Sequence, residues 1–445
     1  LNWEEVVPKD KLSYIIGNPP FLGARLMSSS QKEDMLHVFG KLKGVGNLDY
    51  VSAWYRKSAE LIQNTKVEVA LVSTNSITQG EQVAILWKNL MLDFEIIINF
   101  AYLPFVWNSE AKDKAKVHCV IVSFAVEDRK EKLLFDTKNQ INKVNRINGY
   151  LIEADSIFIE NRKVSLSNIK DINYGSFALD DGNFTISEEE YIDIISKDKP
   201  AQSFLKSFVG AKELLNSINR YCIWLQNIPP NEIRKSFVVM KKVEAVRIWR
   251  ENSKRGNTLA LAKTPTLFAE IRQPIENYLA VPTVSSEKRK YIPMAFLSKD
   301  VIASNQIYTI SGADLYDFAI LTSNVHMAWM RTVAGRLKSD YRYSAKIVYN
   351  NFPWPTVTEE QKEFIANTAQ GILDARALYP DSSLADLYDE LTMPVELRKA
   401  HQANDIAVMK AYGMIKKVDG KDTFLTESET VARLFEMYQE LTKKK

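Results

Sequence analysis

The chain has 445 residues, enough for two or three domains, and its 46% hydrophobic and 25% charged content is typical of a globular protein with a large core. A formal net charge of +3 is too small to indicate nucleic-acid binding by itself, so that argument has to come from local clusters of basic residues. Its apolar stretches are shorter than the roughly 20 residues that cross a bilayer, and no basic-then-apolar signal segment is found at the N-terminus. These features predict a cytoplasmic protein without a membrane partner.

The cysteines and histidines do not favour a metal site or a cysteine nucleophile. Cys119 lies in the apolar run at residues 117–122, where a small buried thiol is expected, and Cys222 is the other cysteine. The four histidines are far apart, and no Cys-x-x-Cys or His-x-x-x-His spacing occurs. We therefore expect a reducing compartment and no metal.

The first part of the chain alternates short Val/Ile/Phe-rich runs with segments of helical apolar spacing. This pattern predicts strands at 12–18, 67–74, 94–101 and 117–126, and helices at 28–39, 47–64 and 79–92. Alternation of this kind predicts an α/β fold with a largely parallel sheet, helices on its faces, and ligands at the carboxyl ends of its strands.

The remainder of the chain changes character twice. Residues 127–355 are more polar and less regular, which predicts a mixed α+β domain that begins near the charged run at 128–132 and contains a basic helix at 231–255. After the two prolines in residues 352–355, the pattern predicts a wholly helical segment, with helices at about 358–378, 384–391, 395–415 and 426–443. The expected domains are 1–130, 131–355 and 356–445.

The tetrapeptide Asn18-Pro19-Pro20-Phe21 directly follows the first predicted strand. The exocyclic amine of adenine is a poor nucleophile, and the Asn18 side-chain oxygen and the Pro19 carbonyl can each accept one of its two protons. The proline pair has fixed φ angles that hold this carbonyl in place, and Phe21 offers a ring on which a base can stack. We therefore predict a catalytic role for all four residues; the alternative is a simple turn after a buried strand.

A second feature is an aromatic cluster that leads into the strand predicted at 117–126. It consists of Phe100, Tyr102, Phe105 and Trp107. Swinging a base out of a duplex costs a few kcal/mol, and stacking on an aromatic side chain returns roughly 1–3 kcal/mol. Phe105 and Trp107 are thus candidates for the second wall of a base pocket, and the alternative is that they belong to the core.

Basic residues gather in the predicted helix at 231–255 and in the stretch 331–346, where tyrosines are interleaved with them. Arginine can bond guanine edges in a bidentate manner, lysine mainly neutralises phosphate, and tyrosine adds stacking. The segment 269–274 adds a further arginine at strand spacing. The predicted DNA contacts are Arg247, Arg250, Lys254, Arg255, Arg272, Arg336, Lys338, Tyr341, Arg342 and Tyr343. The alternative for a basic helix is a solvated face.

Residues 15–27, with the sequence Ile-Ile-Gly-Asn-Pro-Pro-Phe-Leu-Gly-Ala-Arg-Leu-Met, resemble motif IV of DNA adenine methyltransferases, in the form found in MmeI-like bifunctional type II restriction-modification enzymes. Other stretches agree in the same order, namely 47–55, 73–82, 284–287, 335–344 and 349–355. The resemblance covers nearly the whole chain and is weakest from about 130 to 230. It implies the C-terminal half of a class I methyltransferase sheet, a target recognition domain and closing helices, with Asn18, Pro19 and Phe21 holding a flipped adenine.

The chain departs from this family in one respect. Class I methyltransferases bind S-adenosylmethionine with a glycine-rich turn after the first strand and an acidic residue after the second, and neither precedes Asn18. We therefore expect a C-terminal portion of a longer parent, whose missing N-terminal methyltransferase part, together with a possible nuclease, binds the cofactor. The expected partner is double-stranded DNA, and this fragment is expected to be inactive, with no cofactor bound.

Two other functions stay open. The same tetrapeptide suits a methyltransferase for RNA bases or for protein glutamine, although the long recognition region argues against a small substrate. The other candidate is a non-catalytic DNA specificity subunit that supports a separate catalytic chain.

Overall fold

The computed structural model describes residues 3–107, 117–138, 140–418 and 420–443. Contacts within the chain divide it into two compact units. The first unit comprises residues 1–167, 328–354 and 414–445, and the second comprises 168–327 and 355–413. The units interleave along the sequence, so the predicted segments 131–355 and 356–445 each contribute to both.

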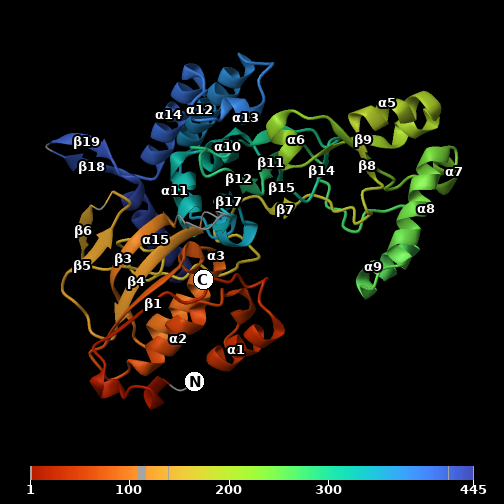
Figure 1. The fold of residues 1–445 in the computed structure, drawn as a ribbon. Helices are drawn as coiled ribbons and strands as arrows, with labels where there is room; N and C mark the ends of the chain where they lie inside the picture. Colours follow the sequence, from red (N-terminus) through yellow and green to blue (C-terminus); the bar gives the residue numbers. More distant parts are fainter. Residues whose placement is uncertain (1–2, 108–116, 139, 419, 444–445) are drawn as a thin grey trace. The chain divides into compact units, whose positions relative to one another are not determined.

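The first unit is built on a six-stranded sheet with the order β1-β2-β4-β3-β5-β6 (Figure 1). Strand β1 is parallel to β2, whereas β4 is antiparallel to both of its neighbours, β2 and β3. The sheet is therefore mixed rather than largely parallel, because β3 and β4 follow each other in the chain and pair with each other. The strands are β1 Tyr14–Gly17, β2 Glu68–Thr74, β3 Ile97–Trp107, β4 Val117–Ala125, β5 Lys132–Phe135 and β6 Ile141–Val144.

Helix α2 packs on one face of this sheet. Its fully buried Tyr55 donates a hydrogen bond to the Leu71 carbonyl on β2 (3.2 Å), and its ring stacks on Phe124 of β4 with centroids 5.5 Å apart. The helix predicted at 79–92 is present, but a π-helical turn at Val83–Trp87 interrupts it. The helices of this unit include α1 Ser29–Phe39, α2 Ser52–Leu61, α3 Gly80–Gln82, α4 Lys88–Asp93 and α15 Glu427–Lys443.

The opposite face of the sheet is apolar and open at β1. Side chains alternate between the two faces of a strand, and the register of Ile15 with Val69 and of Val69 with Phe124 places Ile15 on the α2 side. Tyr14 and Ile16 therefore point the other way, and they are 65% and 79% exposed. Within the described part of the chain, no strand pairs with the outer edge of β1.

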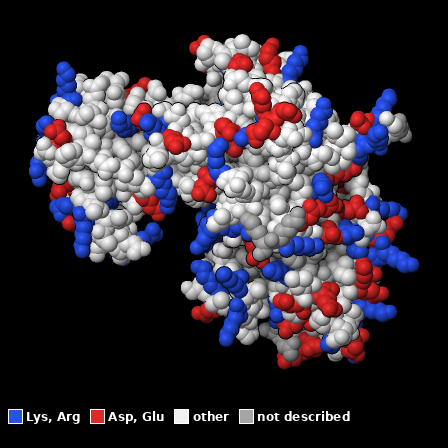
Figure 2. All heavy atoms as spheres, turned by 180° about the vertical axis from the view of Figure 1, so that it is seen from behind, with Lys and Arg blue, Asp and Glu red and all other residues white. Residues whose placement is uncertain are grey.

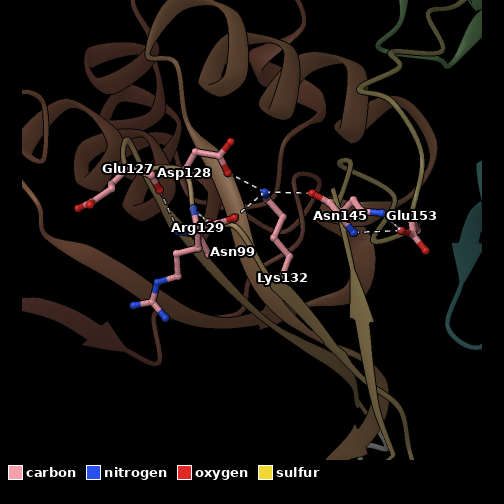
Figure 3. A network of polar contacts seen from close by, with 7 residues as sticks. All are labelled: Asn99, Glu127, Asp128, Arg129, Lys132, Asn145 and Glu153. Atoms are coloured by element: carbon pink, nitrogen blue, oxygen red, sulfur yellow. Dashed lines mark hydrogen bonds and ion pairs between the residues drawn. The ribbon is translucent and has the colours of Figure 1, made fainter.

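A polar network joins the far edge of the sheet to the segment after β6 (Figure 3). Lys132, at the start of β5, is buried, and its ammonium group donates to the Asp128 carboxylate (2.6 Å) and to the Asn145 carbonyl (3.1 Å). The Asn145 amide in turn donates to Glu153 (3.0 Å). The charged run at 128–132 is thus fixed to the sheet, because a buried ammonium group is retained only when it is hydrogen-bonded.

Two hairpins also belong to the first unit. Strand β16 (Gly335–Leu337) pairs with β17 (Asp340–Arg342), and β18 (Ile415–Val418) pairs with β19 (Lys421–Phe424). The second hairpin corrects the expectation that the chain after residue 355 is wholly helical. Its strands are short and rich in exposed lysine, so they lack the apolar alternation from which strands are predicted.

The second unit contains two four-stranded sheets, with the orders β14-β9-β10-β8 and β13-β11-β15-β7. Helices α12 and α14 pack together in this unit, and α8 packs on the core beside β9 and β10 (Figure 1). The strands are β7 Ile172–Tyr174, β8 Thr185–Ser187, β9 Leu205–Val209, β10 Arg220–Ile223, β11 Tyr278–Pro282, β13 Ala295–Leu297, β14 Ile302–Ala303 and β15 Ile307–Ser311; a short strand, β12, spans Val284–Ser285. The helices are α5 Glu188–Lys197, α6 Ala211–Asn216, α7 Pro230–Ile233, α8 Phe237–Glu251, α9 Gly256–Ala260, α10 Leu315–Leu321, α12 Glu359–Ala377, α13 Leu384–Leu387 and α14 Val395–Ala411; α11 spans Asn324–Val333, across the boundary between the units.

The basic segment predicted as one helix at 231–255 is divided between α7 and α8, with a break at 234–236, and α8 ends at Glu251, before Lys254 and Arg255. Among the helices that the structure describes, none combines the length and the apolar character that a membrane span requires.

Candidate functional site

The predicted acceptor motif lies at the carboxyl end of β1, beside β2. The parallel register of Gly17 with Leu71 brings Asn18 to the edge of the sheet at which β2 also ends. Asn18 and Pro20 are exposed, Pro19 is buried, and Phe21 is half-buried. The loop is therefore open to solvent on its Asn18 side and packed against the protein at Pro19.

Two oxygens of this motif, on the Asn18 side chain and on the Pro19 carbonyl, can accept hydrogen bonds. Among the described residues, none hydrogen-bonds to the Asn18 side chain or to the Pro19 carbonyl. Both oxygens can therefore accept hydrogen bonds from a ligand. Phe21, which is half-buried, lies two residues after Pro19. This arrangement can accept two protons from one planar amino group.

The segment after the motif is tied to the start of α2. The backbone N–H of Tyr50 donates to the Leu22 carbonyl (2.9 Å), and the Leu26 N–H donates to the Gly23 carbonyl (2.9 Å), which closes a turn. The buried carboxylate of Asp49 lies beside this turn. Asp49 has no local sequence signal, because its side chain contacts residues that are 25 positions away on either side.

Phe105 and Trp107 lie at the same edge of the sheet as the motif. Strand β3 runs parallel to β1 and β2, because each of β2 and β3 is antiparallel to β4. Cys119 of β4 pairs with Thr74 on one side and with Phe105 on the other, so Phe105 is level with the end of β2. At about 4.8 Å per strand, the backbone of Phe105 is about 14 Å from β1 across the sheet. Trp107 is 44% exposed, and its ring centroid is 6.3 Å from that of Phe105.

The hairpin β16–β17 packs on the segment that follows β2. A Cβ atom at Gly80, which has a φ of +55°, would lie 3.2 Å from the Cα of Gly335, so the two backbones are in close contact. The Arg336 guanidinium lies over the Tyr341 ring, 3.9 Å from its centroid, and donates to the Ser339 carbonyl (2.8 Å). This hairpin and the acceptor motif, which are more than 300 residues apart in sequence, therefore belong to the same unit.

The predicted contact residues of the hairpin region differ in exposure. Lys338, with a φ of +58° at the turn, and Arg342 are exposed, and Arg336 is half-buried. Tyr341 and Tyr343 are buried. These two tyrosines support the hairpin from within, and the lysine and the arginines form its surface.

Other predicted DNA contacts lie in the second unit. Lys254 and Arg255 are exposed just after α8, whereas Arg247 is paired with Glu244 (2.5 Å) and Glu251 (2.6 Å). Arg272 forms an ion pair with Glu270. Figure 2 shows Lys and Arg side chains spread over the part of this unit that carries α5 to α9, at the left of the view, with fewer acidic side chains among them.

Arg250 does not belong to this surface, which corrects the prediction that it contacts DNA. The side chain is fully buried, and its five N–H groups donate to five backbone carbonyls at distances of 2.9–3.2 Å. The acceptors belong to Ala178, Leu179, Leu261, Thr264 and Leu267. Arg250 therefore joins α8 to two loops of the unit.

The two cysteine thiols and the His326 imidazole are buried. Burial raises the pKa of Cys119 and of Cys222 above the ordinary value of a thiol, which disfavours the nucleophilic thiolate. Burial likewise lowers the pKa of His326 to about 3. Within the described residues, no group of three or more His, Cys, Asp or Glu side chains is placed to hold a metal ion.

Three family models match the chain in succession. They are described as "MmeI, DNA-methyltransferase domain" for residues 1–136, "MmeI, target recognition domain" for 153–356, and "MmeI, C-terminal domain" for 357–444. The chain belongs to the MmeI family. The fold agrees with that of the type IIL restriction-modification enzyme MmeI, solved in complex with DNA, with a TM-score of 0.91 and 42% sequence identity.

A curated relative is similar over the same extent. DNA methyltransferase A of Bacillus subtilis (strain 168) is 38% identical over 447 residues, which cover 100% of this chain and 50% of the relative. The match to the solved MmeI covers 100% of this chain and 59% of that protein. The chain thus spans between half and three fifths of the length of these two relatives.

Replacing Arg250 with methionine is expected to lower the free energy of unfolding by at least about 3 kcal/mol, because each buried carbonyl left unpaired costs about 1–3 kcal/mol. Lys254→Met, which changes an exposed neighbour, should change it by less than about 0.5 kcal/mol. Urea unfolding of both variants measures the difference. An Arg250→Met protein that kept its stability but bound DNA less tightly would restore the original assignment.

Proposed function

We propose that this chain is the acceptor half of a DNA N6-adenine methyltransferase domain, joined to a target recognition domain. The observation that carries the proposal is a pair of oxygens, on Asn18 and Pro19, that accept no hydrogen bond from the described residues and that precede the half-buried Phe21 at the carboxyl edge of the sheet. These groups match an adenine that presents two amino protons and an aromatic face. The similar structure of MmeI was solved in complex with DNA, which supports DNA as the partner of this chain.

In the proposed reaction, the two oxygens accept hydrogen bonds from the two N–H groups of the amine of an everted adenine. The bonds draw the nitrogen toward tetrahedral geometry and free its lone pair for attack. Phe21 stacks on one side of the base, and Phe105 or Trp107 covers the other. This catalysis acts by position and electrostatics, and it requires no general base with a shifted pKa.

The methyl donor of such enzymes is S-adenosylmethionine, which supplies the methyl group. Class I methyltransferases hold this donor with a glycine-rich turn after the first strand and an acidic residue after the second, and the seventeen residues before Asn18 contain neither. The chain spans only part of the length of its two relatives, and we propose that a further methyltransferase segment pairs with β1 and covers Tyr14 and Ile16. Exposed apolar side chains on a parallel edge strand favour this, since parallel strands are normally buried on both faces.

The recognition role is assigned to exposed and half-buried basic residues of both units. In the first unit these are Arg336, Lys338 and Arg342 of the hairpin, and in the second they are Arg247, Lys254, Arg255 and Arg272. Paired residues such as Arg247 and Arg272 would exchange a carboxylate for a phosphate, whereas Lys254 and Arg255 need no such exchange.

The isolated chain is expected to bind duplex DNA but to transfer no methyl group. The measurement is incorporation of labelled methyl from S-adenosylmethionine into a random-sequence duplex, beside a binding assay. Methylation by the purified 445-residue chain would contradict the assignment of the cofactor site to another segment.

In the longer polypeptide that includes the proposed segment, Asn18→Ala is expected to lower the methylation rate by about 100-fold or more, as removal of one preorganised polar group does in other enzymes. The Kd for DNA should stay within about two-fold, because Asn18 acts on a base that has already been everted. Asn367→Ala, an exposed asparagine on α12, serves as the control. A specificity subunit without a catalytic role would keep full methylation in both variants.

Replacing Lys254 and Arg255 together with alanine is expected to reduce the slope of log K against log salt by about one for each lost phosphate contact. Binding should weaken to a similar extent for all duplex sequences. The matched control is Lys399→Ala on α14, which is exposed and lies outside the proposed surface. An unchanged slope in the double variant would remove this end of α8 from the DNA contacts.

A further inference from the structure

Asp49 joins the acceptor loop to the end of β2. It lies just before α2 and is only 8% exposed. One carboxylate oxygen, Oδ1, accepts a hydrogen bond from the Ala24 N–H (3.3 Å), and the other, Oδ2, accepts one from the Thr74 hydroxyl (3.2 Å). A single buried side chain thus connects the segment after the Asn18 motif with the last residue of the neighbouring strand.

Asp49 is itself held on its backbone side. Its N–H donates to the Gln82 side-chain oxygen (3.1 Å), and the next residue, Tyr50, donates its N–H to the Leu22 carbonyl (2.9 Å). A Cβ atom added at Gly23 would lie 3.8 Å from Asp49 Oδ1, so the loop passes close to the carboxylate. Segment 22–24 is therefore fixed to the start of α2 at Leu22 and at Ala24.

We propose that Asp49 is a positioning residue of the methyl-acceptor site, which fixes Asn18 and Phe21 at the sheet edge by holding the loop that follows them. This inference rests on the proposed function. Both carboxylate oxygens are engaged within the protein, so Asp49 acts on the loop and not on the substrate. The loop needs such a support because a displacement of about 1 Å in a reacting group can cost a factor of about 100 in rate.

The substitutions Asp49→Ala and Asp49→Asn separate this role from simple packing. In the longer polypeptide, we expect Asp49→Ala to lower kcat by about ten-fold or more and to leave the Kd for DNA within about two-fold, because the loop is displaced but the reading surface is unchanged. Asp49→Asn should retain kcat within about three-fold, because an asparagine oxygen can accept from Ala24 and its amide can donate to Thr74. Thr74→Val should lower kcat less than Asp49→Ala and add little to it in the double variant, because the two residues share one hydrogen bond.

Amide hydrogen exchange of the 445-residue chain provides a readout that does not depend on activity. The amides of residues 22–26 should exchange faster in Asp49→Ala and at the parent rate in Asp49→Asn. The matched control is Asp34→Ala, which removes an exposed aspartate that accepts a hydrogen bond from the Tyr50 hydroxyl (2.8 Å) and should leave kcat unchanged.

The outcomes distinguish this inference from the proposed function. The inference is overturned if Asp49→Ala has the same kcat per folded molecule as the parent. It is also overturned if Asp49→Asn loses as much kcat as Asp49→Ala while the two variants are equally stable. Asn18→Ala is measured in the same series. If that variant stays active, the proposed function fails, whereas if it is inactive and Asp49→Ala is not, only the role of Asp49 fails.

Discussion

The pairing of β1 with β2 determines where every part of the candidate site lies. The side-chain period of a strand is two residues, so a slip of one residue would exchange the two faces of β1. In the observed register, Ile15 faces the helix-covered side and Gly17 pairs with Leu71. The chain then leaves the sheet with Pro19 buried and Asn18 exposed. The four-residue register between β1 and β2 thus determines that the Asn18 amide is exposed and that Pro19 is buried.

The same strand also shows that the sheet is open to a further partner. Strand β1 is an edge strand that pairs in parallel with β2, and parallel strands are normally covered on both faces, yet β1 carries Tyr14 and Ile16 exposed on one face and an unpaired edge within the described residues. An apolar edge of this kind favours pairing with another strand. The relatives, in which matching residues make up only part of a longer protein, are consistent with a segment that covers it.

Local sequence patterns determine some elements of this fold, and contacts between distant residues determine others. The strands β1, β2 and β4 and the helix α1 lie close to their predicted positions, because apolar periodicity and a Ser28 capping box are local signals. The role of Arg250 could also have been found locally, since Val239, Val243, Val246 and Arg250 follow one another at helical spacing and form the buried stripe of α8. A count of basic residues in that helix hides this pattern, because charge alone does not show which face a side chain occupies.

Other features depend on contacts that no local pattern contains. Asp49 becomes part of the site only because the chain brings Ala24 and Thr74 to it from opposite directions in sequence. The hairpin β16–β17 follows the second unit's segment 168–327 in the chain, yet it packs on Gly80 in the first.

A continuous set of contacts within the first unit runs from this hairpin to the acceptor loop. Gly335 contacts Gly80, Gln82 two residues further on accepts from the Asp49 N–H, and Asp49 holds Ala24. Under the proposed function, the hairpin that would read one base pair and the loop that would hold the everted base are therefore fixed to the same structural element. Their separation along the DNA is then set by the first unit itself, whatever position the second unit takes. A rigid spacing of this kind explains why recognition and modification would share one polypeptide, since a methyltransferase must modify a base at a constant distance from the sequence it reads.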